Sequence, residues 1–327
     1  MSRPHIVVLD DTERAMRRLG DWTRIDTQAE VTIHHAPLTG VALVDALKNA
    51  DAIVLMRDRT PFTAELLAQL PKLRYLVFTG TRNAKLDLAA LAGRGIPVSH
   101  TEFGPSKDST CELTWTLILA ATKQLASHTA RLKAGAWRGE LSEALPCTLA
   151  GQRLGLIGLG EIGGRVAKVG KALGMEVVTW SPRMTAERAA EQGVAFVPLD
   201  ELLATSPVVS LHLVVLETTR HLLNAARLAL MQPGSLLVNT SRSELIDTAG
   251  LVQALRQGRP GFAALDVFDV EPLPADDPLR GLPNVLLTPH LGFVTEPVFQ
   301  RFASGVTECL QAWLAGAAPI RPVPVKT

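Results

Sequence analysis

The chain has 327 residues, of which 47% are hydrophobic and 20% are charged, and its net charge at pH 7 is +1. This length and composition predict about two globular domains with a sizeable core and no long disordered segment. The balanced charge excludes the broad basic surface on which nucleic-acid binding depends.

The first hundred residues alternate short apolar runs with helical patterns. The first run follows the N-terminus MSRPHIVVLDD, which lacks the apolar core and the cleavage site of a signal peptide. Short strands separated by helices predict a parallel sheet that is covered on both faces. The predicted strands cover 5–9, 31–35, 52–56, 73–78 and 96–100, and helical patterns between them include 41–50 and 63–70.

The second of these strands contains the adjacent histidines His34 and His35. Neighbouring side chains of a strand point to opposite faces, so we do not expect the pair to share an ion, and no metal site is predicted. The three cysteines are widely spaced without a C-x-x-C motif, so we expect neither a disulfide framework nor a zinc site. Cys111, Cys147 and Cys309 are expected to be small buried residues of a cytoplasmic protein.

A long helical segment at 108–134 separates this set of elements from a second one. Its most apolar part, LTWTLILAA at 113–121, is too short to span a bilayer, so we expect a buried helix and no membrane association. The second set predicts another parallel sheet, and the last predicted helix covers 296–314. Two sheets joined by a long helix predict two α/β domains with a cleft between them. The second set of strands covers 153–158, 176–180, 195–199, 207–213, 235–240, 261–267 and 284–288.

The segment LIGLGEIGGRVAKVGKALG contains a G-x-G-x-x-G motif between a predicted strand and a predicted helix. In that context Gly158 permits a tight turn, Gly160 lets a diphosphate approach the backbone, and Gly163 lets helix and strand pack closely. The N–H groups and the positive end of the helix would then hold the phosphates of a dinucleotide. The alternative is a glycine-rich turn without a ligand. The residues of the motif are Gly158, Leu159, Gly160, Glu161, Ile162 and Gly163.

The helix that follows the motif shows an apolar repeat. Ile162, Val166, Val169 and Leu173 recur at helical spacing and predict the buried face. Gly174 is the expected C-terminal stop.

A carboxylate that binds the adenosine ribose is expected about 20 residues after the motif. The stretch VVTWSPRMT offers Ser181, Pro182 and Arg183 there instead. Without the carboxylate nothing repels a 2′-phosphate, and the Arg183 guanidinium can pair with one. We therefore predict a site that tolerates or prefers NADP(H). The alternative is that Arg183 is a solvated surface residue and that NAD(H) binds without the acid.

Three polar residues stand just past the ends of later predicted strands. Arg242 lies in NTSRSELID, Glu271 in LDVFDVEPLPADDPL and His290 in LLTPHLGF. Open parallel sheets bind ligands at this carboxyl edge, so the three side chains are candidates for one site. Taken singly, each is as readily explained as a surface or capping residue.

In combination with the glycine motif, these stretches resemble the D-isomer-specific 2-hydroxyacid dehydrogenases. GLGEIG, NTSR, LDVFDVEP and TPH carry the resemblance in that order, and TPF and TGTRNAKLD indicate one branch of the family. The resemblance implies an α/β fold with two doubly wound parallel sheets. It implies a Rossmann dinucleotide-binding domain at 103–290 and a flavodoxin-like substrate domain at 1–102, completed by 291–327.

The resemblance also implies catalytic roles. His290 would be the general acid–base, Glu271 would orient its imidazole and favour its charged form, and Arg242 would bind the carboxylate and polarise the carbonyl of a 2-keto acid. Asp266 would hold the nicotinamide carboxamide. Further cofactor contacts would come from Thr110, His212, Leu213, Thr219, Thr240 and Ser241. The substrate carboxylate would meet Thr81, Arg82 and Asn83, and also Arg57 unless that residue is a surface charge paired with Asp58.

Relatives in this family are dimers in which the long helix embraces a second subunit, so a homodimer is expected. Trp115, Leu117, Ile118 and Leu125 give this helix an apolar surface, for which burial inside one subunit is the alternative.

Four residues depart from the family pattern. Ser181 replaces the ribose-binding acid, Ser243 replaces a Gly and can narrow the pocket, and Val214 replaces a Pro with little expected effect. Arg82 replaces a Gly of the carboxylate loop, where it either suits a more acidic substrate or is structural.

The expected activity is oxidoreduction between small 2-keto acids of the glyoxylate or hydroxypyruvate kind and D-2-hydroxy acids, with NADP(H) or NAD(H). Phosphoglycerate is not the expected substrate, because many enzymes that act on it carry a regulatory C-terminal domain. Two other functions stay open. One is a nicotinamide-sensing interaction protein like the corepressors of this family, and the other is a formate or phosphite dehydrogenase on the same scaffold.

Overall fold

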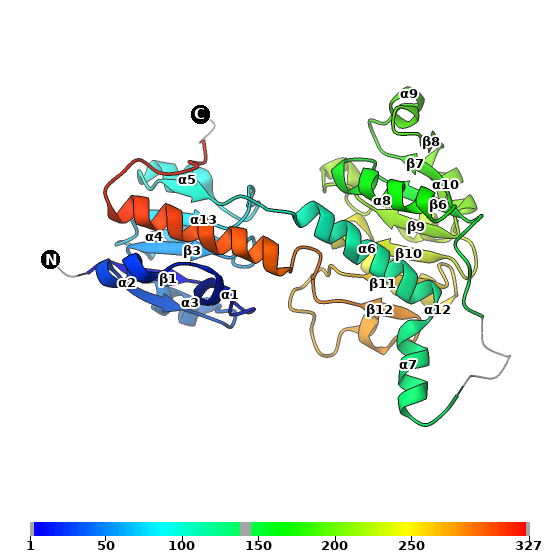
Figure 1. The fold of residues 1–327 in the computed structure, drawn as a ribbon, viewed down its shortest axis with the longest axis horizontal. Helices are drawn as coiled ribbons and strands as arrows, with labels where there is room; N and C mark the ends of the chain where they lie inside the picture. Colours follow the sequence, from blue (N-terminus) through cyan, green and yellow to red (C-terminus); the bar gives the residue numbers. More distant parts are fainter. Residues whose placement is uncertain (1–2, 138–144, 325–327) are drawn as a thin grey trace. The chain divides into compact units, whose positions relative to one another are not determined.

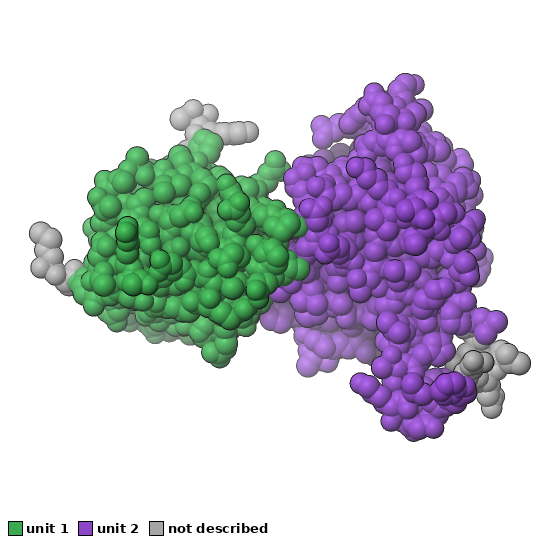
Figure 2. All heavy atoms as spheres, in the orientation of Figure 1, with its two compact units in different colours: residues 1–105, 295–327 green, residues 106–294 purple. Residues whose placement is uncertain are grey.

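The computed structural model describes residues 3–137 and 145–324, which form two compact units (Figure 1). Unit 1 comprises residues 1–105 and 295–327, and unit 2 comprises residues 106–294 (Figure 2). The chain thus leaves unit 1 once and returns to it with its last helix. Each unit is built around one parallel β-sheet.

Unit 1 holds a five-stranded sheet in the order β2-β1-β3-β4-β5, in which every neighbouring pair is parallel. The strand order changes direction at β1 and β3, as in flavodoxin-like domains. The strands are β1 (His5–Val8), β2 (Glu30–Ile33), β3 (Ala52–Leu55), β4 (Tyr75–Phe78) and β5 (Val98–His100). The helices are α1 (Ala15–Leu19), α2 (Thr23–Gln28), α3 (Gly40–Leu47), α4 (Ala64–Ala68), α5 (Leu88–Gly93) and α13 (Glu296–Leu314).

The last helix, α13, belongs to the core of unit 1. It packs against α1 and α2 and against strands β4 and β5. Trp313 near its C-terminal end stacks on Tyr75 of β4, with ring centroids 5.6 Å apart. Beyond the helix, the Val323 amide donates to the Val98 carbonyl, so the C-terminal segment extends the edge of the sheet.

Unit 2 holds a seven-stranded parallel sheet in the order β12-β11-β10-β9-β6-β7-β8. Counted from β6, this is the Rossmann order extended by one strand. The strands are β6 (Arg153–Ile157), β7 (Glu176–Trp180), β8 (Ala195–Phe196), β9 (Val208–Leu211), β10 (Leu236–Asn239), β11 (Phe262–Leu265) and β12 (Val285–Leu287). The α-helices are α6 (Ser106–Thr122), α7 (Leu125–Lys133), α8 (Glu161–Ala172), α9 (Ala186–Ala190), α10 (Leu199–Thr205), α11 (Ala225–Leu228) and α12 (Thr248–Arg256). Short 3-10 helices are η1 (Glu217–Thr219), η2 (Ser243–Leu245) and η3 (Pro278–Gly281).

Alternate residues of these strands enter different core layers. Leu154 and Leu156 of β6 pack with residues of α6 and α8, whereas Ile157 packs with residues of α10 and α12. The two-residue period follows from strand geometry, and burial of both faces explains the continuous apolar runs in the sequence. The predicted fold class is confirmed, and each predicted strand overlaps an observed one.

The prediction of one helix at 108–134 is wrong. The chain breaks between α6 and α7 at Gln124, whose φ of 52° is left-handed. The Thr122 carbonyl, at the end of α6, accepts the amide of Cys147 at 3.1 Å. Among the described residues, no helix has both the length and the apolar character that crossing a membrane requires.

The predicted buried face of α8 is also wrong in part. Its buried residues are Gly163, Val166, Ala167 and Gly170, whereas Val169 and Leu173 are each 38% exposed. The helix lies close to the sheet, so small residues face it: a Cβ on Gly170 would lie 2.9 Å from a methyl carbon of Leu154. Gly174 has a φ of +76° and ends the helix, as predicted.

The apolar residues expected to face a second subunit divide into two groups. Trp115, Leu117 and Ile118 of α6 are buried inside unit 2, so for these the intramolecular alternative is correct. Leu125 of α7 is 58% exposed.

Candidate active site

Two of the three motif glycines shape the turn between β6 and α8. A Cβ on Gly158, whose φ is +107°, would lie 2.6 Å from the carbonyl oxygen of His212. A Cβ on Gly163 would lie 2.1 Å from the carbonyl oxygen of Gly158. Because Cβ atoms do not approach other atoms this closely, both positions require glycine for the fold itself.

Gly160 has a different environment. Apart from its own chain neighbours, a Cβ there would meet no heavy atom within 4 Å. Gly160 is the N-cap of α8 and offers no side-chain acceptor to the free N–H groups of the first turn. Open space beside free amide donors fits a diphosphate, so the turn fits a dinucleotide cofactor.

The other motif residues line this turn. Leu159 is buried, and Ile162 packs against the core between α6 and α8. Glu161 begins α8 and accepts a hydrogen bond from Lys107 of α6. That hydrogen bond lowers the pKa of Glu161, and the Lys107 charge balances the carboxylate next to the expected phosphates.

His212 follows β9 and lies against the glycine turn. Its Nε2 is 3.0 Å from Oγ of Ser210. Burial lowers the pKa of His212 to about 4. The imidazole is therefore neutral at physiological pH, because its charged form would be poorly solvated at this position.

The residues expected at the ribose end lie just past β7. The half-buried Ser181 accepts the Met184 amide through its carbonyl at 3.0 Å. Pro182 and Arg183 are exposed. Arg188 of α9 donates to the carbonyl of Arg183 at 2.7 Å, whereas the Arg183 guanidinium itself has no hydrogen bond or ion pair with any described residue.

His290 and Glu271 form the closest pair of predicted catalytic residues. Nδ1 of His290 lies 2.7 Å from Oε2 of Glu271, and Oε1 of Glu271 accepts the amide of Phe268 at 2.9 Å. Burial alone would raise the pKa of Glu271, but the hydrogen bond from His290 and the charges of His290 and Arg242 hold it below its usual range. The carboxylate is thus ionised and oriented toward the imidazole.

Arg242 lies just beyond the end of β10 and is exposed. The buried Asn239 supports its backbone, because Nδ2 of Asn239 donates to the Arg242 carbonyl at 2.8 Å and its Oδ1 accepts the Ser241 amide at 3.0 Å. The Arg242 guanidinium donates once to the Ser241 carbonyl, at 2.7 Å. Its other N–H groups can bind an anion. Its positive charge also contributes to the lowered pKa of Glu271.

Most of the other residues predicted to contact the cofactor form hydrogen bonds to the protein itself through their hydroxyl groups. Thr219 accepts the Leu216 amide at 2.7 Å, and Thr240 bonds Thr114 at 2.8 Å. Ser241 donates to the Leu213 carbonyl. Leu213 is half-buried, and Val214 is 64% exposed. Thr110 and Asp266 bind the loop that carries His290, as described below.

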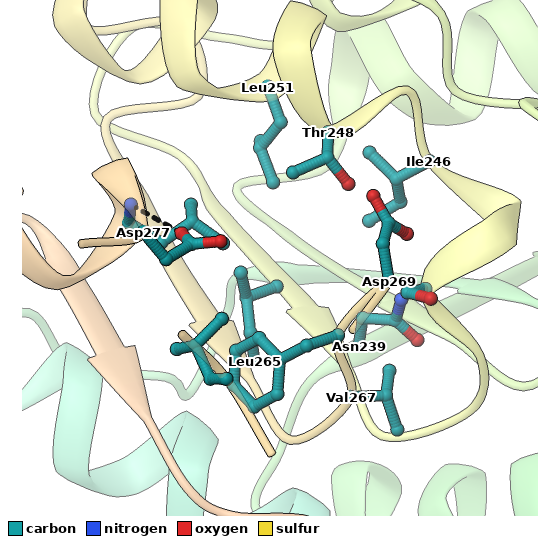
Figure 3. Close-up of a pocket in the computed structure, with 12 residues that line it drawn as sticks. Asn239, Ile246, Thr248, Leu251, Leu265, Val267, Asp269 and Asp277 are labelled. Carbon is teal, nitrogen blue, oxygen red and sulfur yellow. Dashed lines mark hydrogen bonds between the residues drawn. The ribbon is translucent and has the colours of Figure 1, made fainter. Parts of the chain in front are cut away.

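A small cavity of about 30 Å³ lies between the two loops that bear Arg242 and Glu271 (Figure 3). Ser243 lines it, together with Asn239 and Val267. Asp269 points toward Thr248, the first residue of α12 (Figure 3). A cavity of this volume can hold about two water molecules and is too small for a cofactor.

The predicted substrate residues of unit 1 gather at the ends of β3 and β4. Arg57 is only 8% exposed, and its Nη1 donates to the carbonyls of Thr79 and Arg82 at 3.1 and 3.2 Å. Its guanidinium lies 4.2 Å from the centroid of the Phe103 ring. Asn83 donates to the Arg57 carbonyl at 2.8 Å. The interpretation of Arg57 as a surface charge is therefore wrong, because these contacts bury it beneath the loop.

Thr81 and Arg82 lie on the exposed side of this loop. Across the described part of the chain, the Arg82 guanidinium has no hydrogen bond or ion pair. A cation without an internal partner can meet an anionic ligand.

Sequence reasoning missed three residues that support the site. Asn239 holds the Arg242 loop, and Thr288 and Ser109 hold the His290 loop. Asn239 and Thr288 stand inside the NTSR and TPH-containing stretches, so the motifs gave a signal for them. Nothing in the sequence linked Ser109 to a loop 183 residues away.

Residues 115–292 match the family model described as D-isomer specific 2-hydroxyacid dehydrogenase, NAD binding domain. A glyoxylate reductase from Aeropyrum pernix is 35% identical over 329 residues, covering 98% of this chain and 95% of that protein. A D-3-phosphoglycerate dehydrogenase from Methanocaldococcus jannaschii is 36% identical over 280 residues, which are 85% of this chain and 52% of that protein. The crystal structure of a phosphoglycerate oxidoreductase from Vibrio cholerae superposes with a TM-score of 0.88 at 34% identity, covering 97% of this chain and all of the other.

Proposed function

This chain belongs to the D-isomer specific 2-hydroxyacid dehydrogenase family, and we propose that it reduces glyoxylate, hydroxypyruvate and similarly short 2-keto acids to D-2-hydroxy acids. It is a nicotinamide-dependent oxidoreductase of 2-keto and 2-hydroxy acids. The proposal rests on the 2.7 Å contact between His290 and Glu271, in the unit that also bears the glycine turn. Two relatives named glyoxylate reductase support short substrates.

His290 is the proposed proton donor. Its Nδ1 is engaged by Glu271, so Nε2 is the nitrogen that meets the substrate. During reduction Nε2 gives its proton to the carbonyl oxygen, and in the reverse direction it takes the proton of the hydroxyl group. The nicotinamide, when bound, supplies or accepts the hydride. Glu271 accepts the Nδ1 proton and keeps the imidazole oriented for this transfer.

Arg242 is the proposed ligand of the substrate carboxylate. Its guanidinium carries N–H groups beyond the one donated to Ser241, and a planar fork matches a carboxylate in two places. The same charge polarises the adjacent carbonyl, which lowers the barrier to hydride addition.

Unit 1 is the proposed substrate domain, and its loop with Thr81, Arg82 and Asn83 would offer amide groups to a substrate carboxylate. The contacts of Arg57 with Thr79 and Arg82 support this loop from below.

NADP(H) is the proposed cofactor, with the 2′-phosphate near Ser181 and Arg183. The Arg183 guanidinium has no partner among the residues that the structure describes, and Ser181 stands where a carboxylate would repel the phosphate; both support this preference. Glu161 and the turn at Gly160 would lie next to the diphosphate.

A homodimer in the cytoplasm is the proposed assembly and location. Helix α7 has no buried residue, and its Leu125 and Leu132 are 58% and 57% exposed. Apolar side chains at this spacing on one helix support a partner copy there. All three cysteines are free, which supports a reducing compartment. Light scattering of wild-type protein should give the mass of a dimer, and a monomer mass would contradict the proposal. The double variant Leu125→Asp with Leu132→Asp should give the monomer mass.

A screen of 2-keto acids with both reduced cofactors tests the activity. Glyoxylate and hydroxypyruvate should oxidise NADPH in wild-type protein, and His290→Ala should lose about three orders of magnitude in turnover while still binding NADPH. Oxidation of formate or phosphite alone, or near-normal turnover of His290→Ala, would contradict the proposal.

A further inference from the structure

Asp266 lies just past the end of β11 and is completely buried, with 0% of its surface exposed. Its Oδ1 accepts the hydroxyl of Thr288 at 2.6 Å and the amide of Leu291 at 2.7 Å. Its Oδ2 accepts the amide of Gly292 at 2.9 Å. All three donors belong to the loop that carries His290, so this carboxylate is bound to the residues on both sides of the imidazole.

The backbone of His290 explains why two neighbouring amides reach one carboxylate. His290 has a φ of 53°, in the left-handed region that a residue with a side chain rarely adopts. A left-handed residue turns the amides around it toward one side, which forms a small anion-binding concavity. Here the concavity formed by the Leu291 and Gly292 amides is filled by Asp266.

A second contact holds the same loop from the opposite direction. The Gly292 carbonyl accepts the hydroxyl of Ser109 at 2.9 Å. Oγ1 of Thr110 lies 2.9 Å from the same carbonyl and 2.8 Å from the Ser106 carbonyl, so its single proton serves one of them at a time. Gly292 is thus held at its N–H by Asp266, just past β11, and at its C=O by residues of α6.

We propose that Asp266 is a positioning residue for His290, which holds the imidazole at bonding distance from Glu271 by fixing the loop from Thr288 to Gly292. Ser109 is its counterpart on α6. This inference rests on the proposed function of His290, and it gives Asp266 a task that does not require the cofactor.

The charge of Asp266 is necessary for this task. A carboxylate can accept all three hydrogen bonds because it carries no N–H group of its own. An amide side chain would instead direct its N–H groups at the Gly292 amide. Burial raises the pKa of Asp266, and the hydrogen bonds of Thr288, Leu291 and Gly292 oppose that rise. Asp266 interacts electrostatically with His290, and Arg242 with Glu271.

Asp266→Asn and Thr288→Val test the proposal, with Thr179→Val as the matched control. Thr179 is buried in β7, and its hydroxyl donates to the Leu156 carbonyl at 2.9 Å rather than to Asp266 or the loop that carries His290. Thr288→Val removes one donor from Asp266 and leaves the carboxylate in place, so it answers the question even if Asp266→Asn fails to fold.

Turnover should fall about 100-fold in Asp266→Asn and about tenfold in Thr288→Val, since small misplacements of a catalytic group have effects of this size. The pH profile of turnover should shift in both. The Kd for NADPH, measured by fluorescence, should stay within about twofold in Thr288→Val, and Thr179→Val should match wild type throughout.

An NMR measurement without cofactor separates this inference from the proposed activity. In ¹⁵N-histidine-labelled protein, the Nδ1–H signal of His290, assigned by its loss in His290→Gln, should broaden in Asp266→Asn and Thr288→Val but not in Thr179→Val. An unchanged signal in both variants would overturn the positioning role, as would a loss of NADPH affinity in Asp266→Asn with normal turnover at saturating cofactor. Absence of 2-keto acid reduction in wild-type protein would instead contradict the proposed function alone.

Discussion

Glu271 links His290 to the backbone of its own loop: its Oε2 lies 2.7 Å from Nδ1 of His290, and its Oε1 accepts the Phe268 amide at 2.9 Å. Glu271→Gln keeps the shape and removes the charge. We expect turnover to fall about 10- to 100-fold. The amide can turn an N–H group toward Nδ1, so the imidazole loses the acceptor that orients it.

Asp269→Asn is the control for this change, since it removes an exposed carboxylate two residues away. Its turnover should match that of wild-type protein. If Glu271→Gln also turns over at the wild-type rate, Glu271 does not orient His290 for proton transfer.

Cofactor preference depends on Ser181 and Arg183 in the proposed site. Arg183→Ala should raise the KM for NADPH about 10- to 100-fold, as expected when a charged hydrogen bond is lost. The KM for NADH should change little. Ser181→Asp should disfavour NADPH by repelling its 2′-phosphate and should favour NADH by binding the ribose.

Arg153→Ala is the matched control for Arg183→Ala. Arg153 pairs with Glu176 at the N-terminal ends of β6 and β7, whereas Arg183 follows the C-terminal end of β7. Steady-state kinetics with both reduced cofactors measure the effect. A wild-type protein that clearly prefers NADH would contradict the assignment at once.

Gly160 and Gly163 should respond differently to the same substitution. Gly163→Ala places a Cβ 2.1 Å from the Gly158 carbonyl oxygen, so we expect a loss of about 1–3 kcal/mol in the free energy of unfolding. Gly160→Ala meets no protein atom within 4 Å, so stability should stay within about 0.5 kcal/mol. The Kd for NADPH should nevertheless rise at least about tenfold, because the methyl group occupies the space for the diphosphate.

Urea denaturation and fluorescence titration separate the two effects. Wild-type cofactor affinity in Gly160→Ala would show that no diphosphate approaches this position. Gly164 in the same helix does not serve as a control, because its Cβ would lie 2.8 Å from the Gln192 side chain.

The sequence predicted the strands well and the helix faces less well. Strands buried on both sides are apolar runs bounded by turns, so β6 and β7 could be located directly. The face of α8 was misjudged because hydrophobic spacing treats glycine as neutral. Gly163 and Gly170 are the residues that approach the sheet, and they do so because they lack side chains.

In the candidate site, too, some features could be predicted from the sequence and others could not. Arg242, Glu271 and His290 could be picked out because each follows a strand, and parallel strands end at one edge. The burial of Arg57 could not be predicted, because it depends on Phe103 and on a loop about 25 residues away. The contacts of Asp266 were equally hidden, since they follow from the left-handed backbone of His290.

His212 should make the stability of the protein depend on pH. Burial lowers its pKa to about 4 in the folded state, whereas an unfolded histidine titrates near about 6.5. As the pH falls through that range, the unfolded chain binds a proton that the folded protein does not. The free energy of unfolding should therefore decline by up to about 3 kcal/mol between pH 7 and about pH 4, and stay level with respect to this group above pH 7.

His212→Gln removes this titration and keeps a polar group near Ser210. Urea denaturation at a series of pH values should give a flatter profile for His212→Gln than for wild-type protein. The exposed His221 is the control, because His221→Gln should leave the slope unchanged. Equal slopes in wild type and His212→Gln would mean that His212 is solvated in the folded state.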